Sequence, residues 1–210
     1  MVRARPAARV RRPRLGGTDG NEVLTHAVAA VLTVVLAAEG ITLLRFRQLI
    51  SVHMFIGMVL IPVVAVKLAS TGYRFARYYL HTPAYVEKGP PLLALRVLAP
   101  LLVLTTVLIL VTGVWLMLLG HHSDALLTVH KVSFIVWSAL FAVHFLCYLP
   151  RVVRSLREFD RAPGSGLRAS LVAVALVVGI GLAIVVLPTI SAFHQRHHHD
   201  REANAALKRS

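Results

Sequence analysis

The sequence predicts an all-α integral membrane protein, a helical bundle whose chain crosses the bilayer about five times. Hydrophobic residues make up 57% of the 210 residues and charged residues only 15%, which excludes a soluble globular surface for most of the chain. Apolar stretches also reach the roughly 20 residues that a helix needs to cross the hydrocarbon core. There are five of them: residues 22–44, 50–72, 97–119, 125–149 and 168–190.

The connections between these spans set their directions. Only a few residues, Phe46 to Leu49, connect the first two spans, so these helices must be antiparallel neighbours. The next loop begins with the aromatic and basic run GYRFARYYLHTPAY and ends at Gly89-Pro90-Pro91. The loop from Gly120 to Asp124 is short and nearly uncharged. Successive spans therefore cross the membrane in alternating directions.

Basic residues at the ends of the spans predict the orientation of the chain. The formal net charge is +14, but Lys and Arg are not gathered on one soluble domain, so we expect membrane lipid and no nucleic acid as a partner. They are concentrated in the N-terminal tail and in the loops after the second and fourth spans. The positive-inside rule then places the N-terminus in the cytoplasm and the C-terminus outside the plasma membrane.

Neither the first span nor the cysteine content suggests a secreted, disulfide-linked protein. The first span is over twenty residues long, lacks an A-x-A-like cleavage site and is followed by further spans, so we interpret it as a retained signal anchor. The single cysteine, Cys147, excludes an intrachain disulfide, a CxxCH haem attachment and a Cys-rich metal site.

Composition divides the chain into four parts. Residues 1–21, rich in Arg, Pro and Gly, are expected to form a disordered basic cytoplasmic tail. Residues 22–149 contain four spans and form the core. Residues 150–192 are expected to form a cytoplasmic loop and the fifth transmembrane helix, and residues 193–210 an extracytoplasmic tail.

Four histidines lie inside the predicted spans, where ionisable side chains are costly and usually mark function. His26 lies at the cytoplasmic end of the first span and His53 at the outer end of the second, whereas His130 and His144 both lie in the fourth. His130 and His144 are ~21 Å apart along a helix axis and within ~40° of one face. The alternating directions match His53 with His130 in depth near the outer boundary, and His26 with His144 near the cytoplasmic boundary.

Each depth-matched pair suits the two axial positions of a flat iron macrocycle. The pattern therefore predicts two b-type haems, with His26, His53, His130 and His144 as iron ligands, in a four-helix haem-binding core with a fifth transmembrane helix added. Filled axial positions favour electron transfer over oxygen activation. Zinc or copper is disfavoured, because no carboxylate or thiol completes either level. The alternative is a cofactor-free structural or transport protein whose histidines only hydrogen-bond between helices.

One histidine in each of the first two spans and H-x13-H in the fourth, HKVSFIVWSALFAVH, form a recognisable pattern. It resembles the di-haem b-type cytochrome subunits of membrane formate dehydrogenases and nickel–iron hydrogenases, and the related bacterial cytochrome b-561-type proteins. The resemblance covers roughly residues 20–150, and the fifth span departs from the four-helix pattern. It implies the ligand pairs His26 with His144 and His53 with His130.

The same resemblance implies electron exchange between the membrane quinone pool and either a partner oxidoreductase or an external acceptor. Quinone is then a further partner or cofactor, and a catalytic oxidoreductase subunit is left open. A ferric-reductase-like protein is a third reading, but it would place two histidines on each of two helices.

Several intramembrane residues have two interpretations each. Trp137 lies either between the two haems or in ordinary aromatic packing. Gly57 and Gly113 either give a porphyrin room or let helices pack closely. Lys67 either neutralises a haem propionate or reaches towards the cytoplasmic surface. Glu39, the only acidic residue well inside a span, either serves proton transfer at a quinone site or forms a hydrogen bond between helices.

Two polar clusters lie near the membrane surfaces. Arg74 and Arg77, with Tyr73 and Tyr78, either bind propionates or a quinone headgroup or form an aromatic and basic belt. We interpret the C-terminal histidines as part of a solvated tail without a site. They are His194, His197, His198 and His199.

Overall fold

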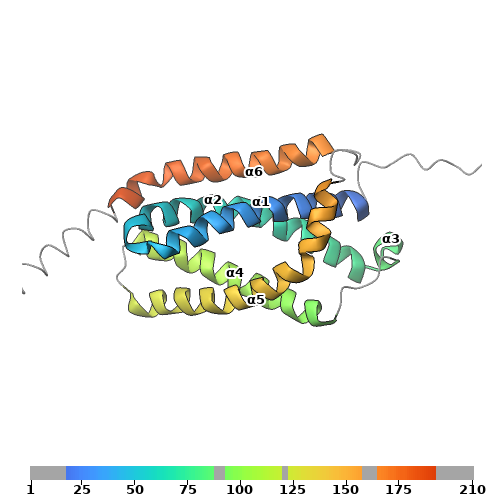
Figure 1. Ribbon diagram of the computed structural model, residues 1–210, viewed down its shortest axis with the longest axis horizontal. Helices are drawn as coiled ribbons and strands as arrows, with labels where there is room; N and C mark the ends of the chain where they lie inside the picture. Colours follow the sequence, from blue (N-terminus) through green and yellow to red (C-terminus); the bar gives the residue numbers. More distant parts are fainter. Residues whose placement is uncertain (1–17, 88–92, 120–122, 158–164, 193–210) are drawn as a thin grey trace, which may run out of the picture.

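A computed structural model describes residues 18–87, 93–119, 123–157 and 165–192, and in this part of the chain it contains helices and no strands (Figure 1). The all-α membrane bundle predicted from composition is confirmed. The helices are α1 (Thr18–Leu44), α2 (Phe46–Tyr79), α3 (Pro83–Val86), α4 (Leu93–Leu119), α5 (Asp124–Arg157) and α6 (Ser165–Val185).

Five of these helices are long and apolar enough to cross a membrane, and they coincide with the predicted spans. Two extend well beyond them. α2 continues to Tyr79, and α5 continues past Pro150, where the sequence predicts the start of a loop. Proline removes one backbone hydrogen bond and bends a helix without necessarily ending it. Figure 1 shows the end of α5 turned across the bundle.

The turn between α1 and α2 is tighter than the expected connection from Phe46 to Leu49. Only Arg45 separates the two helices, with φ −130° and ψ 45° outside the helical region. Phe46 already belongs to α2, which has a further irregular residue at Leu49 (φ −108°, ψ 16°). Among the described helices α1 and α2 share the most extensive interface, so the prediction that they are antiparallel neighbours is confirmed.

The helices are arranged in layers, with α6 on one side, α1 and α2 in the middle, and α4 and α5 on the other side (Figure 1). α6 packs mainly on α2, and α4 packs mainly on α5. α1 also contacts α5, and α2 contacts α4, so these four helices form a bundle to which α6 is added. α2 and α5 have no extensive direct contact.

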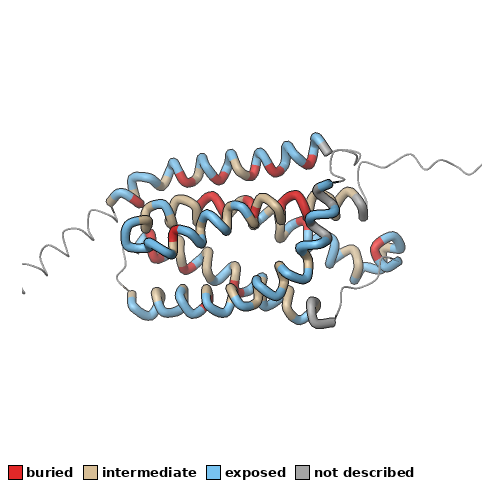
Figure 2. The backbone as a smooth tube through the Cα atoms, in the orientation of Figure 1, coloured by how far each residue is buried: buried red, intermediate tan, exposed pale blue. Residues whose placement is uncertain are grey.

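Packing is tight around α2 and loose around α5. Two buried apolar clusters join α2 to its neighbours, one centred on Val28 and Val63 and the other on Val59 and Ala183. Buried residues make up 28% of the most apolar window of α2 but only 6% of that of α5, a contrast visible in Figure 2. α5 thus carries two of the four candidate histidines on the least buried of the five spans.

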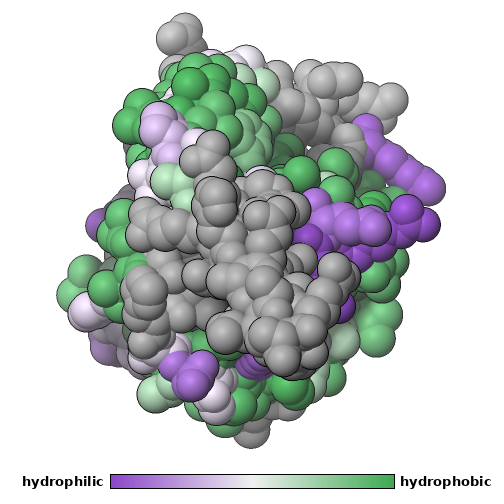
Figure 3. Space-filling view, turned by 90° about the vertical axis from the view of Figure 1, so that its left-hand side faces the viewer, coloured by the Kyte–Doolittle hydropathy of each residue, from purple (hydrophilic) through white to green (hydrophobic). Residues whose placement is uncertain are grey.

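The close approach of α6 to α2 depends on a glycine. A Cβ atom on Gly179 would lie 2.7 Å from the carbonyl oxygen of Val59 and 3.2 Å from Cγ of Pro62. Hydrophobic side chains cover much of the described surface around the bundle, as Figure 3 shows from the end where α1 meets α2. Such a surface fits contact with membrane lipid.

Candidate functional site

The four intramembrane histidines occupy two levels of the bundle. At the outer level, His53 on α2 and His130 on α5 lie close enough to interact electrostatically. At the inner level, His144 on α5 lies within electrostatic range of Lys67 on α2. The ammonium group of Lys67 contacts Thr25, which precedes His26 on α1. His26 is buried, and the other three histidines are half-buried.

The ring of His53 is held by two polar groups of α1. Its Nδ1 lies 2.8 Å from Oε1 of Glu39 and 3.2 Å from Oγ1 of Thr42. The Thr42 hydroxyl donates its only proton to the carbonyl oxygen of Glu39 at 2.6 Å, so towards His53 it accepts. Nδ1 of His53 therefore carries the imidazole proton, and Nε2 keeps its lone pair.

His130 is held in the same way by α4. Its Nδ1 lies 2.9 Å from Oγ1 of Thr112, and the Thr112 hydroxyl donates to the carbonyl oxygen of Leu108 at 2.6 Å. The hydroxyl again accepts from the imidazole, so the lone pair of His130 is also on Nε2. A Cβ atom on Gly113 would lie 3.2 Å from Cε1 of His130. Gly113 therefore lets this ring rest against the α4 backbone.

At the inner level, the ring of His144 is held differently. Nδ1 of His144 is buried and has no hydrogen-bond partner in the described part of the chain, and its ring stacks on Tyr148 with centroids 4.7 Å apart. Lys67 donates a hydrogen bond from Nζ to the carbonyl oxygen of Thr25 at 2.9 Å. Lys67 therefore joins α2 to α1 beside His26, and its ammonium group does not extend towards the end of α2.

Trp137 lies on α5 between the two levels. Its indole Nε1 donates to Oγ1 of Thr106 on α4 at 2.9 Å, and its ring stacks on Phe141 with centroids 4.7 Å apart and planes 9° from parallel. These contacts are the aromatic packing expected as one of its two roles. They fix α5 against α4 midway between His130 and His144.

Glu39 takes the interhelical role expected as one of its two possibilities, through its bond to His53. Its second oxygen, Oε2, is buried and has no hydrogen-bond partner among the described residues. Gly57 lies beside this carboxylate, at 3.9 Å from a Cβ atom built on the glycine, which is an ordinary contact.

The threonines Thr42, Thr106 and Thr112 are missing from the sequence-based set of site residues. The hydroxyl of a threonine inside a transmembrane helix usually donates to a backbone carbonyl of the same helix, as all three hydroxyls do here. A threonine in the sequence therefore does not by itself indicate a functional site. Their contacts with His53, Trp137 and His130 on other helices cannot be seen before the helices are placed.

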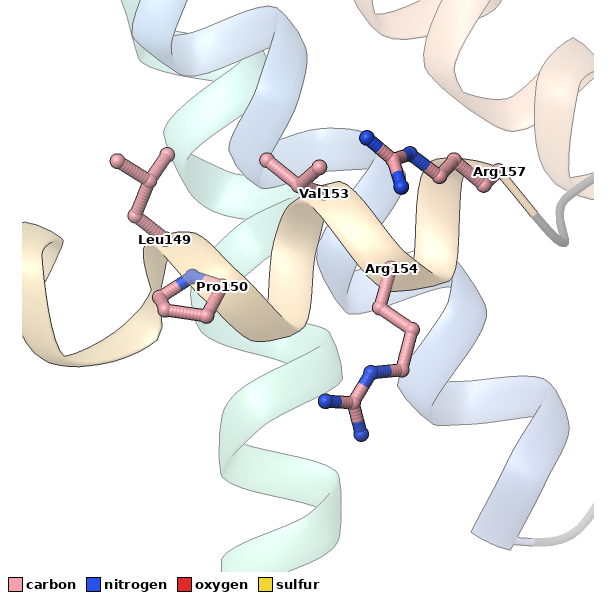
Figure 4. A pocket seen from close by; sticks show the side chains of 5 residues that line it. All are labelled: Leu149, Pro150, Val153, Arg154 and Arg157. Atoms are coloured by element: carbon pink, nitrogen blue, oxygen red, sulfur yellow. The ribbon is translucent and has the colours of Figure 1, made fainter.

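The remaining candidate sites have fewer supporting contacts than the histidine levels. Across the described ranges, no three His, Cys, Asp or Glu side chains gather closely enough to hold a metal ion. A shallow groove of about 640 Å³ lies at the end of α5, where Arg154 and Arg157 point in different directions (Figure 4). The C-terminal histidines His194, His197, His198 and His199, and most of the expected N-terminal tail 1–21, lie outside the described residues.

Comparison of the chain with models of protein families, with curated proteins and with solved structures found no match.

Proposed function

We propose that the chain transfers electrons across the membrane through two b-type haems, each held between two histidines. The observation that carries the proposal is the oxygen contact at Nδ1 of both His53 and His130. Each imidazole gives its Nδ1 proton to an oxygen of a neighbouring helix and keeps the Nε2 lone pair. A histidine that ligates a metal through one nitrogen and donates from the other has this arrangement. The outer residues therefore fit a bis-histidine iron centre.

The inner pair, His26 and His144, fits a second centre through its position. α1 and α5, which carry these residues, contact each other directly. Lys67 places a cation beside both histidines, and a cation at this depth matches the carboxylate of a haem propionate. The pairs are those that the depth argument and the resemblance both imply.

The packing of the bundle supports the same proposal. α2 and α5 carry the outer pair and lack extensive direct contact, and α5 is the least buried span. A flat ligand between these helices would bury apolar surface of α5 that the other helices leave uncovered.

Bound haem supplies one-electron chemistry, and the protein residues determine its use. Because each iron would be held by two of the four histidines, neither would keep an open position for oxygen or a substrate. Glu39, Thr42 and Thr112 fix two of the rings against rotation. From the resemblance, we propose quinone as one partner and an oxidoreductase subunit or an external acceptor as the other. We place the chain in the plasma membrane, with its N-terminus cytoplasmic and its C-terminus extracytoplasmic.

The second candidate is a cofactor-free structural or transport protein. One observation favours it, because the bonds of His53 to Glu39 and of His130 to Thr112 already join pairs of helices. In this case each histidine would serve only as an interhelical hydrogen-bond partner.

Electron transfer is tested with haem-loaded protein in sealed vesicles that contain a trapped electron acceptor. We expect externally added quinol to reduce the haems and then the acceptor. The His144→Ala variant is the matched control, because it removes one inner ligand and should block transfer across the bilayer while the outer centre stays loaded. Haem-loaded protein that quinol does not reduce would contradict the proposed role of quinone.

A further inference from the structure

Aromatic and basic residues gather at the end of α2 that lies away from the α1–α2 turn. Figure 1 shows α3 beside this end of α2 and set off from the bundle. We call the group the arginine–tyrosine cluster. It consists of Tyr73, Arg74, Arg77 and Tyr78 on α2, Tyr85 on α3 and Arg96 on α4. In the proposed orientation this end is cytoplasmic.

The rings and guanidinium groups of the cluster contact one another across three helices. The rings of Tyr73 and Tyr85 meet edge to face, with centroids 6.1 Å apart. Cζ of Arg77 lies 5.9 Å from the centre of the Tyr73 ring, and Cζ of Arg96 lies 5.9 Å from that of Tyr78. These contacts hold α3 and the start of α4 against the end of α2.

The cluster contains buried donors that the described residues do not satisfy. Tyr85 is only 6% exposed, and its hydroxyl has no hydrogen-bond partner of regular geometry there, although the Tyr73 hydroxyl is near. Nε of Arg77 is likewise buried without a partner in the described part of the chain. Burial raises the pKa of the Tyr85 phenol, which therefore stays protonated and remains a donor.

The cluster also carries positive charge that no described carboxylate neutralises. Arg74 and Arg77 both lie close enough to act electrostatically on Tyr85. Among the described residues, neither arginine has a carboxylate within ion-pair distance, and the contact between Glu39 and His53 lies far along α2. Guanidinium and phenol donors gathered in one cluster without a carboxylate partner match an anionic group with several oxygens, such as a phosphate.

The surroundings favour the phosphate of a lipid over a soluble anion. Phe75 and Val97 are 64% and 66% exposed beside the cluster, on the membrane-facing parts of α2 and α4. An acyl chain can cover these side chains while its headgroup meets the arginines. We propose that the arginine–tyrosine cluster binds the phosphate of an anionic phospholipid, with contacts from Arg74 and Arg77 and a hydrogen bond from the hydroxyl of Tyr85.

This proposal does not depend on haem, and the chain offers a matched control for it. Arg154 and Arg157 present similar charge at the end of α5, in the groove formed with Leu149, Pro150 and Val153 (Figure 4). That groove lacks a buried tyrosine hydroxyl. If charge alone attracts the lipid, substituting an arginine in this groove should weaken lipid binding as much as substituting one in the arginine–tyrosine cluster.

The test is the thermal unfolding of full-length protein, purified in neutral detergent, with added phosphatidylglycerol, phosphatidylcholine or inorganic phosphate. The variants are Arg77→Gln, Tyr85→Phe and the control Arg154→Gln. We expect phosphatidylglycerol alone to raise the Tm of the wild type and of Arg154→Gln by the same amount. The increase should be lost in Arg77→Gln and Tyr85→Phe. Tyr85→Phe keeps the ring and removes only the donor, so it remains informative if Arg77→Gln does not fold.

Several outcomes would overturn the proposal. An equal increase in all variants would indicate unspecific surface charge, and a full increase with inorganic phosphate would indicate a site for free anions. Loss of haem from Arg77→Gln, with the lipid effect intact, would assign the arginine to a haem propionate instead. Haem content measured on the same samples separates these results from a failure of the proposed electron transfer.

Discussion

The outer and inner histidine levels differ in what holds their rings. At the outer level, Glu39 and Thr42 fix His53, and Thr112 fixes His130, through bonds to Nδ1. At the inner level, Nδ1 of His144 has no partner in the described part of the chain, and the polar neighbour is Lys67. The outer pair is therefore preorganised by the bundle itself. The orientation of His144 depends more on the ligand that it would hold.

The largest expected effect is the loss of one haem when an axial ligand is removed. We expect His53→Ala or His130→Ala to remove the outer haem and His26→Ala or His144→Ala to remove the inner one, because one axial nitrogen holds such a haem poorly. Haem content per chain and the spectrum of the haem that remains are the measurements. Loss of the same haem in all four variants would refute the pairing.

The next effect comes from the glycine under His130. In Gly113→Val, the added side chain would occupy the space of Cε1, which lies 3.2 Å from a Cβ atom at this position, and would displace the ring. We expect much reduced outer haem and intact inner haem, measured by the haem content of purified protein. Gly40→Val is the matched control, because nothing lies within 4 Å of a Cβ atom there. If both variants lose haem equally, valine in the helix and not the contact with His130 is responsible.

A smaller effect should follow from neutralising the carboxylate behind His53. Glu39→Gln keeps the shape of the side chain but removes a negative charge that favours ferric over ferrous iron. We expect the outer haem to remain bound at a higher midpoint potential, by about 59 mV for each tenfold change in relative affinity. Redox titration of both haems is the measurement, with Glu87→Gln on the exposed α3 end as the control. A shift of the inner haem alone would contradict the placement of Glu39.

The smallest effect on haem is expected from the contact between α6 and α2. Gly179→Ala places a methyl group 2.7 Å from the carbonyl oxygen of Val59. Overpacking of this kind costs about 1–3 kcal/mol of stability. We expect a lower Tm with two haems still bound, since none of the four histidines lies on α6. Loss of haem from this variant would show that α6 supports the histidine levels.

Hydropathy predicted the spans because each span is a continuous apolar run of about 20 residues. The features that it missed are local. α3 has only four residues, Pro83–Val86, too few for apolar periodicity. The end of α5 beyond Pro150 is basic, so hydropathy gives no sign that the helix continues to Arg157.

The candidate site was predictable where topology alone determines it. The depth of His53 and His130 follows from helix order, and the structure brings them within electrostatic range. The bond of Glu39 to His53 and that of Thr112 to His130 depend on the rotation of α1 and α4 about their axes. Low amphipathicity leaves this rotation undetermined in helices that are apolar on every side.

The most direct test of the central claim is a reduced-minus-oxidised absorption spectrum, with a haem count, on the purified full-length protein. The proposal predicts b-type bands and two haems per chain, of which Glu39→Gln shifts the potential of only one. Purified, folded protein from haem-replete cells that shows no haem bands would contradict the proposal and favour a cofactor-free bundle.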